Sequence, residues 1–320
     1  MEKRNDFHLS FLTWNIYLGA DLTPSAGGLT PAAVSQVFRQ FLATNFPVRA
    51  KAIAREIASK KPKLIGLQEA ERWELKIPNF PIVIYDFVEL LLNELKERGL
   101  HYEVAAHNNN QNVPNIPDSN GNMISFLDRD VILIRKEHRL KVINIQEFNF
   151  TTNFNGFLRG WSAIDVKLDG HVFRMINTHL DPLDPGTRDA QAMELINGPA
   201  NSNLPLIITG DLNSTPNSTT HKIFINSGFH DVWSEVGEDS GFTCCQAPDL
   251  LNAVSRSNER IDYILFKNGW KPIEAELVGE CRSDRTKTGL WPSDHTGVSS
   301  KLDLEDHHHH HHDESSESSS

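Results

Sequence analysis

Residues 161–178 read Trp-Ser-Ala-Ile-Asp-Val-Lys-Leu-Asp-Gly-His-Val-Phe-Arg-Met-Ile-Asn-Thr, and this stretch decides the fold class. Two apolar segments, 161–168 and 171–178, flank the dipeptide Asp169-Gly170. An Asp-Gly pair between alternating hydrophobic runs is typical of a two-residue hairpin turn. Strands joined this closely pair antiparallel, because parallel neighbours need a crossover of a dozen or more residues. The stretch therefore argues against a doubly wound parallel sheet.

Apolar segments of strand length recur on both sides of this hairpin and alternate with helical patterns. Further strands are expected at 7–14, 64–67, 101–106, 123–135, 140–148, 206–209, 261–266, 274–278 and 296–302, and helices at 47–60, 81–98, 187–196 and 221–226. A Gly/Pro/Thr-rich loop is expected after the first strand, and the polar residues 108–122 are expected to form a long surface loop. The pattern predicts an α/β fold in which two mainly antiparallel sheets pack face to face under outer helices.

The composition is that of a globular protein, with 39% hydrophobic and 23% charged residues among 320. About 150 residues per domain would suggest two domains, but no break in composition divides residues 1–303, so a single domain is expected there. Residues 304–320 hold six consecutive histidines among acidic and serine residues; they predict a disordered tail, either a tag or a native low-complexity segment. Without a signal-peptide core or a long apolar run, the chain is expected to be cytoplasmic.

The formal net charge of −11 at pH 7 disfavours non-specific attraction to nucleic acid, so that partner would require a local basic patch. Only three cysteines occur, Cys244, Cys245 and Cys281, which excludes a disulfide framework and fits a reducing compartment. The adjacent pair lacks Cys-x-x-Cys spacing. We therefore interpret these residues as small, partly buried loop residues rather than as a metal or redox site.

Short polar clusters stand at the ends of apolar strands along the whole chain. They are Thr13-Trp14-Asn15, Gln68-Glu69, Asn177-Thr178-His179, Gly210-Asp211-Leu212-Asn213, Arg260-Ile261-Asp262-Tyr263 and Ser293-Asp294-His295. Taken singly, each has an ordinary explanation as a turn, a cap or a strand end. Six together indicate one shared site, because strands packed in sheets can bring their ends to one mouth.

The residue types in these clusters suit phosphate chemistry. Asn15 and Glu69 offer hard oxygen donors without cysteine, which favours Mg²⁺ or Mn²⁺ over zinc. Asp211 can accept a proton from an attacking water, and Asn213 can position that water or a phosphoryl oxygen.

The histidines supply donors for the charge that develops during such a reaction. His179 and His295 can donate to the non-bridging oxygens of a phosphoryl group. Asp262 can orient His295 and stabilise its charged form.

The ordered motifs resemble those of the endonuclease/exonuclease/phosphatase superfamily. They are Leu-Thr-Trp-Asn at 12–15, Leu-Gln-Glu at 67–69, Asn-Thr-His-Leu at 177–180, Gly-Asp-Leu-Asn at 210–213, Arg-Ile-Asp-Tyr-Ile at 260–264 and Ser-Asp-His at 293–295. That superfamily includes DNase I-like nucleases, abasic-site endonucleases, neutral sphingomyelinases and inositol polyphosphate 5-phosphatases. The resemblance implies a four-layer α/β/β/α sandwich and Mg²⁺-dependent hydrolysis of a phosphoester.

The resemblance also implies a role for each matching residue. Asn15, Glu69 and Asp294 would belong to the metal site, Glu69 as a direct ligand; Asp211 would activate or orient water beside Asn213; His179 would contact the scissile phosphate or the leaving group; and His295, paired with Asp262, would bind the phosphate. A histidine at position 179 is similar to the DNase-like and sphingomyelinase-like branches, whereas abasic-site endonucleases generally carry tyrosine there.

Two further segments could contact the substrate. Arg282 and Arg285 precede Trp291, so a basic loop could overhang the site and grip an anion; a solvated loop is the alternative. The aromatic stretch from Phe148 to Trp161 could line a substrate groove or touch lipid, although core packing accounts for most such residues.

The sequence thus predicts a Mg²⁺- or Mn²⁺-dependent phosphodiesterase or phosphatase, and the acidic body favours a small or lipid-linked phosphoester. A DNase-like endonuclease acting on nucleic acid is the alternative. A sphingomyelinase-type lipid phosphodiesterase is less favoured. A non-catalytic binding module on the same fold is disfavoured because every expected catalytic position is filled.

Overall fold

The computed structural model describes residues 8–305, and these form two β-sheets. The first has eight strands: β1 (His8–Asn15), β2 (Leu64–Gln68), β3 (Arg72–Lys76), β4 (Val83–Asp86), β5 (Tyr102–Pro117), β6 (Met123–Arg135), β13 (Trp270–Val278) and β14 (Gly297–Leu304). The second has six: β7 (Leu140–Asn149), β8 (Gly160–Leu168), β9 (His171–His179), β10 (Leu206–Asp211), β11 (His230–Asp231) and β12 (Asp262–Lys267). Their orders are β13-β14-β1-β2-β6-β3-β4, with β5 paired to β6, and β11-β12-β10-β9-β8-β7. All neighbours are antiparallel except β1–β2 and β9–β10.

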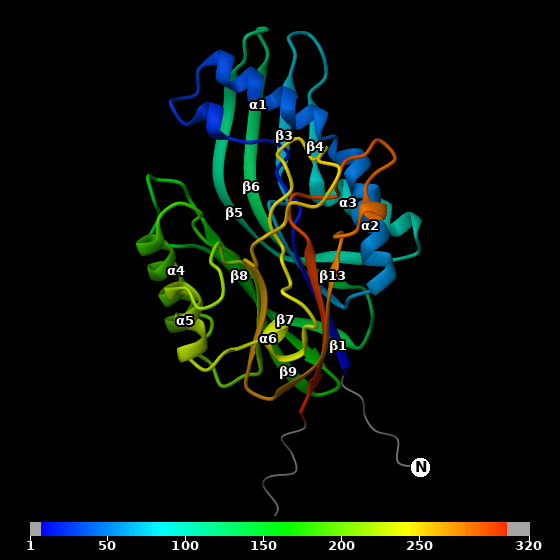
Figure 1. The fold of residues 1–320 in the computed structure, drawn as a ribbon, viewed down its shortest axis with the longest axis vertical. Helices are drawn as coiled ribbons and strands as arrows, with labels where there is room; N and C mark the ends of the chain where they lie inside the picture. The colour runs from blue at the N-terminus through cyan, green and yellow to red at the C-terminus, as the bar shows by residue number, and fades with distance from the viewer. Residues whose placement is uncertain (1–7, 306–320) are drawn as a thin grey trace, which may run out of the picture.

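Helices cover both outer faces. They are α1 (Pro31–Ala43), α2 (Phe46–Lys60), α3 (Phe87–Glu97), α4 (Pro185–Asn197), α5 (Thr219–Asn226) and α6 (Val232–Val236), with short 3₁₀ turns η1 (Thr23–Ser25) and η2 (Arg282–Asp284). Helices α2 and α3 lie on one side of the molecule, and α4 and α5 lie on the opposite side (Figure 1). Separate apolar clusters fill the space between α1–α3 and the first sheet, between the two sheets, and between the second sheet and α4–α5. The four-layer α/β/β/α sandwich is therefore confirmed.

Strand β1 shows how the sequence directs side chains into these layers. Successive side chains of a strand point to opposite faces. Leu12 and Trp14 pack in the helix-side core, whereas Leu9 and Phe11 pack between the sheets. Asn15 has the same parity as Leu9 and Phe11, so it points toward the second sheet at the end of the strand.

A close contact between the sheets lies directly beneath the strand ends. Gly66 faces this contact, where a β-carbon would come within 2.5 Å of Asn177 Oδ1. The nearby Gln68 Nε2 donates to Asn177 Oδ1 at 2.9 Å. Because Gly66 has no side chain, the two sheets can approach and bring their polar ends together.

Several expectations from the sequence need correction. The Gly/Pro/Thr-rich segment contains α1, whose first turn is capped by the Thr30 side chain. The helix expected at 81–98 begins at Phe87, because β4 occupies 83–86. Strand β3 was not expected at all.

The loop expected at 108–122 is wrong, because β5 continues to Pro117. Asn108 and Asn110 are buried there, and both donate to the carboxylate of Asp130. These buried hydrogen bonds explain why such a polar segment forms a strand.

The disordered tail is expected to begin at residue 304, but Leu304 is the last residue of strand β14. The histidine-rich part of the expected tail lies outside the described residues. The prediction of one domain over 1–303 stays a prediction. None of the helices between residues 8 and 305 has the length and hydropathy needed to cross a membrane.

The Asp86 carboxylate stabilises the start of α3 and its contact with β6. It accepts hydrogen bonds from the backbone N–H groups of Val88 at 3.0 Å and Glu89 at 3.1 Å, and it pairs with Arg129 Nη2 at 2.8 Å. Asp86→Ala removes both the cap and the ion pair. We expect the free energy of unfolding to fall by about 2 kcal/mol, measured by urea denaturation.

The same carboxylate gives a pH-dependent contribution. Burial alone would raise the pKa of Asp86, but the hydrogen bond and charge of Arg129 lower it below the usual value. Its contribution is therefore present above the unfolded-state pKa of about 3.9 and is lost as the pH falls through the lower folded-state pKa. Arg139→Ala is the control, since its ion pair with Asp169 is exposed and should leave the urea midpoint almost unchanged. Equal midpoints for Asp86→Ala and the unmodified protein would contradict this account.

Candidate active site

Strand register brings the predicted residues to one edge of the sandwich. In the parallel pair β1–β2, Asn15 lies opposite Gln68, so Glu69 follows immediately. In the second sheet, Asp211 lies opposite His179 on one side and Asp262 on the other. Both sheets thus end in polar side chains at the same place.

One amide links the two sheets across this edge. Asn15 Nδ2 donates to Glu69 Oε2 at 2.5 Å and to Asp211 Oδ2 at 3.0 Å. Asn15 Oδ1 accepts the N–H of Tyr17 at 3.0 Å, and Glu69 Oε1 accepts the N–H of Leu18 at 3.0 Å. Asn15 therefore positions the two carboxylates through its NH₂ group.

Both predicted histidines face Asp211. His179 Nε2 lies 3.2 Å from Asp211 Oδ2, and His295 Nε2 lies 3.7 Å from the same oxygen. His295 Nδ1 lies 2.8 Å from Asp262 Oδ2, as expected for a carboxylate that orients the ring. Trp14 Nε1 donates to the carbonyl oxygen of His295 at 3.0 Å and fixes its backbone.

The buried charges favour an ionised Asp211 and a protonated His295. Burial alone would raise the pKa of Asp211, but His179 and His295, together with the hydrogen bond from Asn15, hold it well below its usual range. Burial alone would lower the pKa of His295, but Asp262 and Asp211 raise it well above its usual value. At neutral pH the site therefore holds a carboxylate beside an imidazolium.

The remaining two predicted residues border this group. Asn213 donates through its backbone N–H to Asp211 Oδ1 at 3.1 Å, while its side-chain Nδ2 donates to the Leu180 carbonyl at 2.8 Å. Asp294 Oδ1 lies 3.9 Å from His295 Nε2. Burial raises the pKa of Asp294 to about 7. All eight residues predicted for catalysis and metal binding thus lie in one connected cluster.

Five of these residues line a pocket of about 140 Å³: Glu69, His179, Asp211, Asn213 and His295. We call it the catalytic pocket. Its wall also holds charged side chains that the sequence reasoning missed: Glu71, Asp128 and Arg159.

Arg159 is the only guanidinium in that wall and is buried. Its Nη1 lies 2.7 Å from His179 Nδ1 and 3.5 Å from Asp128 Oδ2. A guanidinium can only donate, so His179 Nδ1 accepts and its proton sits on Nε2, directed at Asp211. Arg159 therefore sets the tautomer of His179 and adds a positive charge to the pocket.

A signal for the missed residues exists in the sequence. Glu69 and Glu71 are two residues apart, as are Asp128 and Asp130 on β6. On the otherwise apolar strand β6, carboxylates at this spacing share one face, and such a face is seldom buried without partners. Glu69 and Glu71 lie between β2 and β3, so the same argument does not extend to them. Arg159 has no comparable signal, because it follows an irregular loop.

A second missed arginine fixes the loops that carry the site. Arg49 on α2 is fully buried and donates to the backbone carbonyls of Ile16, Tyr17 and Pro292, at 2.8, 3.0 and 2.8 Å. It thereby joins the segment after Asn15 to the segment before Asp294. Burial lowers the pKa of Arg49 to about 10.

The predicted substrate-binding loop does not reach the catalytic pocket. Trp291, which is predicted to contact substrate, is only 1% exposed and packs with Tyr17, Leu250 and Leu290. Arg285 stacks over the Trp291 ring at 5.9 Å. Neither Arg285 nor Arg282 lines the pocket.

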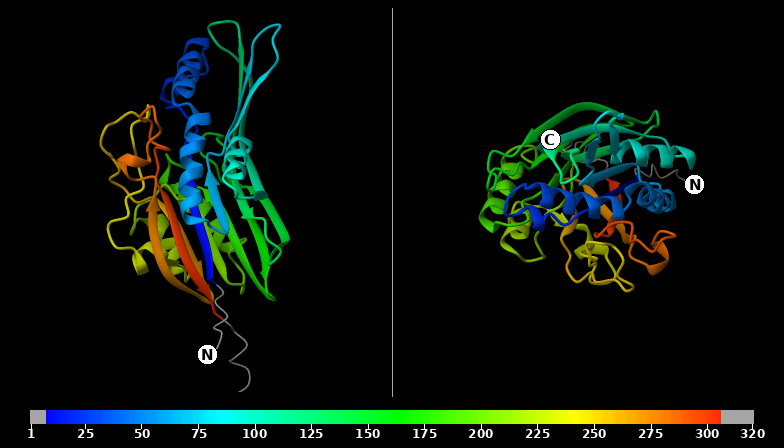
Figure 2. Two further views of the ribbon diagram at one scale, coloured as in Figure 1. Left: turned by 90° about the vertical axis from the view of Figure 1, so that its right-hand side faces the viewer. Right: turned by 90° about the horizontal axis from the view of Figure 1, so that it is seen from above.

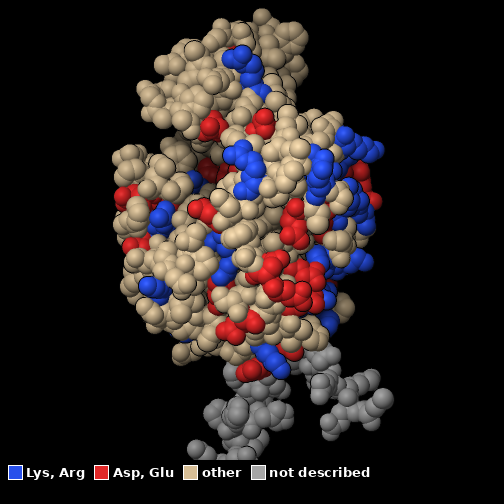
Figure 3. All heavy atoms as spheres, viewed as in Figure 1, with Lys and Arg blue, Asp and Glu red and all other residues tan. Residues whose placement is uncertain are grey.

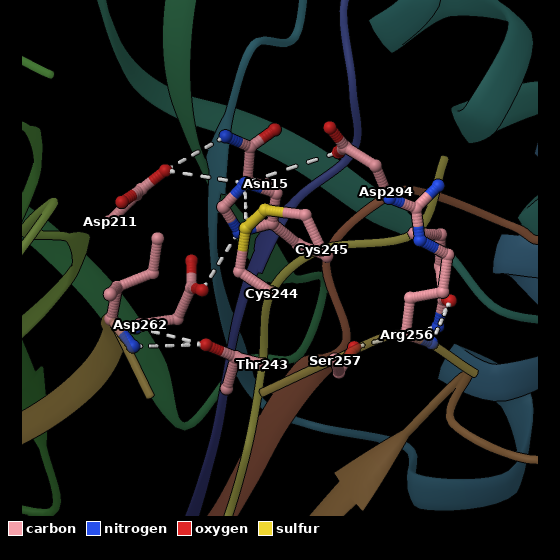
Figure 4. The surroundings of a disulfide bond; sticks show 12 residues. Asn15, Asp211, Thr243, Cys244, Cys245, Arg256, Ser257, Asp262 and Asp294 are labelled. Carbon is pink, nitrogen blue, oxygen red and sulfur yellow. Dashed lines mark hydrogen bonds and ion pairs between the residues drawn. A yellow bond between two sulfur atoms is a disulfide. The ribbon is translucent and has the colours of Figure 1, made fainter. Parts of the chain in front are cut away.

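The cysteine pair lies beside the catalytic histidine. Cys244 and Cys245 form a disulfide, and Cys244 Sγ is 3.8 Å from His295 Nε2. Figure 4 shows the pair among side chains of the site that include Asn15, Asp211, Asp262 and Asp294. The expectation of small, partly buried residues holds for their burial but missed both the bond and the position at the site.

The donor set fits a hard divalent cation. Glu69, His179 and Asp211 each offer an atom within 4.8 Å of the others, and Glu71 and Asp128 add carboxylates to the same wall. Buried carboxylates in this number need compensating positive charge. Oxygen donors of this kind suit Mg²⁺ or Mn²⁺.

Comparison with known proteins identifies the class. Residues 12–295 match the model of the endonuclease/exonuclease/phosphatase family, and the chain belongs to this family of phosphoester hydrolases. Comparison with curated proteins gives no significant match.

Solved structures share the fold at low sequence identity. A family protein from Bacteroides thetaiotaomicron superposes with a TM-score of 0.62 at 16% identity, covering 94% of this chain and 99% of that one. A mannosyl-6-phosphatase from the same species gives 0.58 at 18% identity, covering 92% and 99%. D. rerio TDP2 complexed with a single-strand DNA product gives 0.57 at 17% identity, covering 93% and 100%.

Proposed function

We propose that this protein is a Mg²⁺- or Mn²⁺-dependent phosphoester hydrolase in which water attacks the phosphorus of a compact ester. One observation carries the proposal: Asn15, His179 and His295 all lie within 3.7 Å of Oδ2 of Asp211, a carboxylate that lines the catalytic pocket. The pocket offers a carboxylate for water and positively charged donors for phosphoryl oxygens.

Each side chain of the catalytic pocket has its own role in the hydrolysis. Asp211 remains ionised and accepts a hydrogen bond from the attacking water, which orients a lone pair toward phosphorus. His295, held by Asp262, donates to a non-bridging oxygen as negative charge grows. His179 carries its proton on Nε2, and Arg159 supplies a fixed positive charge beside it.

A divalent cation would be held by Glu69, with Asn15 and Asp294 beside it. When bound, it would act as a Lewis acid toward a phosphoryl oxygen. The Asn15 amide would have to rotate for its oxygen to face a cation, since Oδ1 accepts from Tyr17 here.

Removal of the metal tests this proposal. Treatment with EDTA should abolish hydrolysis of bis-p-nitrophenyl phosphate, and added Mg²⁺ or Mn²⁺ should restore it, as followed by release of p-nitrophenolate. Glu69→Gln should need a higher Mg²⁺ concentration for half-maximal rate. A rate that survives complete chelation would contradict the role of Glu69.

A DNase-like nuclease is the alternative function. The structural similarity to D. rerio TDP2, which was solved with a single-strand DNA product, favours this alternative. On the face shown in Figure 3, Lys and Arg gather along the right-hand edge, where α2 lies in Figure 1, and no continuous basic stripe crosses the rest of this face. Affinity for a nucleic-acid backbone depends on such a surface. Salt-sensitive cleavage of plasmid DNA with Mg²⁺ would support the nuclease, and intact plasmid would exclude it.

A further inference from the structure

A second pocket, of about 260 Å³, opens beside the catalytic pocket. Val34 and Val37 of α1 and Trp73 of β3 form part of its wall. Ser25 and Gln111 are its polar lining side chains, and no Asp, Glu, Lys or Arg lines it. We call it the apolar pocket. A cavity of about 150 Å³ lined in this way suffices for one benzene molecule, so this one can take a ring or a short chain.

The apolar pocket is continuous with the catalytic pocket. Leu22, Phe126 and Phe157 line both. The Arg159 guanidinium stacks 4.9 Å from the Phe157 ring, so this ring separates a cation from the hydrocarbon wall. A phosphoryl group beside Arg159 would direct its substituent past Phe157 into the apolar pocket.

The surrounding structure supports an apolar occupant. The β3–β4 and β5–β6 hairpins project beyond the rest of the sheet next to α1 (Figure 2). On the face shown in Figure 3, this upper part of the molecule carries few charged side chains. A sugar placed here would lose hydration of its hydroxyl groups without enough partners to replace it.

We propose that the apolar pocket binds a hydrocarbon substituent of the substrate, so that the preferred substrates are phosphoesters of apolar alcohols or phenols. The inference rests on the proposed function, because it assigns the catalytic pocket to the phosphoryl group. It narrows the substrate class: esters of sugars and nucleosides lack the group that this pocket fits.

Binding of n-alkylphosphonates tests the inference without turnover, since their carbon–phosphorus bond resists hydrolysis. Methyl-, butyl- and hexylphosphonate would be titrated by calorimetry into the full chain with Mg²⁺. Each methylene buried in the apolar pocket should strengthen binding about four-fold. Hexylphosphonate should therefore bind about 1,000-fold more tightly than methylphosphonate if all of its additional methylenes are buried, and at least about 30-fold more tightly if half of them are. Benzylphosphonate in the same series tells an aromatic from an aliphatic preference. Glucose 6-phosphate should bind no more tightly than methylphosphonate.

A matched pair of variants locates the effect. Val113 on β5 lines the apolar pocket, whereas Val104 on the same strand is exposed and does not line it. Val113→Phe should remove most of the gain with chain length and leave methylphosphonate binding unchanged, and Val104→Phe should change neither. If Val113→Phe fails to fold, the alkylphosphonate titrations of the unmodified protein still test whether affinity rises with chain length.

The outcomes separate the two proposals. Equal affinities along the series, or no binding of any member, would overturn the apolar pocket as a subsite even if bis-p-nitrophenyl phosphate is hydrolysed. A gain with chain length that Val113→Phe does not reduce would overturn the location. A gain that Val113→Phe removes, in a protein that hydrolyses no ester, would support the pocket and refute the proposed function.

Discussion

Asp211→Asn should lower kcat/KM for bis-p-nitrophenyl phosphate by at least about 100-fold while the protein stays folded. The carboxylate is 1% exposed, and Asn15, His179 and His295 all lie within 3.7 Å of its Oδ2. Asparagine fills the same volume but carries no charge, so it accepts a weaker hydrogen bond from water and no longer balances the histidines. The rate of p-nitrophenolate release, with circular dichroism as a folding check, measures the effect.

Asp169→Asn is the control for this variant. Asp169 lies in an exposed hairpin turn with a φ of 47°, a conformation that asparagine also adopts readily. The Asp169→Asn variant should hydrolyse bis-p-nitrophenyl phosphate at the rate of the unmodified protein. If Asp211→Asn did the same, the catalytic role of Asp211 would be refuted.

His295→Ala should also reduce kcat/KM by at least about 100-fold, because it removes a charged donor from the phosphoryl group. It further leaves Asp262 buried without the partner that it holds at 2.8 Å. Burial raises the pKa of Asp262 to about 6, so this carboxyl would take up a proton more readily once the imidazolium is gone. We therefore expect His295→Ala to fold and to lose turnover, as measured with the same ester.

The chain offers a matched control for this second variant. His221 is also buried and lies 3.0 Å from a buried carboxylate, Asp231, but it does not line the catalytic pocket. His221→Ala should lower the urea midpoint and leave kcat/KM almost unchanged. Comparable losses of turnover in both histidine variants would indicate a general structural effect and remove the case for His295 as a donor.

Local patterns predicted most strands, because alternation and turn residues act over a few positions. The hairpin at Asp169-Gly170 and the strand that ends at Asn15 are as expected. The first part of β5 is as expected, but its continuation from Asn108 is predicted as a loop, because the buried polar residue Asn110 is stabilised by Asp128 and Asp130, which lie on another strand. Helix α1 is not predicted from the sequence. Its apolar side chains are buried only by packing against aromatic residues from other parts of the chain.

Long-range packing also decided which side chains face a substrate. Trp291 follows a basic loop in the sequence, yet it packs against Leu250 and Leu290 and is closed off from the pocket. Arg159 gives no signal along the chain, yet it reaches His179 from the irregular segment just before β8. The position of Trp291 depends on Leu250, which lies far along the chain, and Arg159 comes from a segment without a regular pattern.

The sequence by itself determined the chemistry of this protein: the carboxylates, amides and histidines at strand ends, and the order in which they occur. Only the tertiary structure decided their geometry. Asn15 and His295 share a site because β1 pairs with β14 and the two sheets meet at Gly66. The apolar pocket likewise exists only where α1 packs over β3, β5 and β6, because a cavity is a property of surfaces brought together from distant parts of the chain.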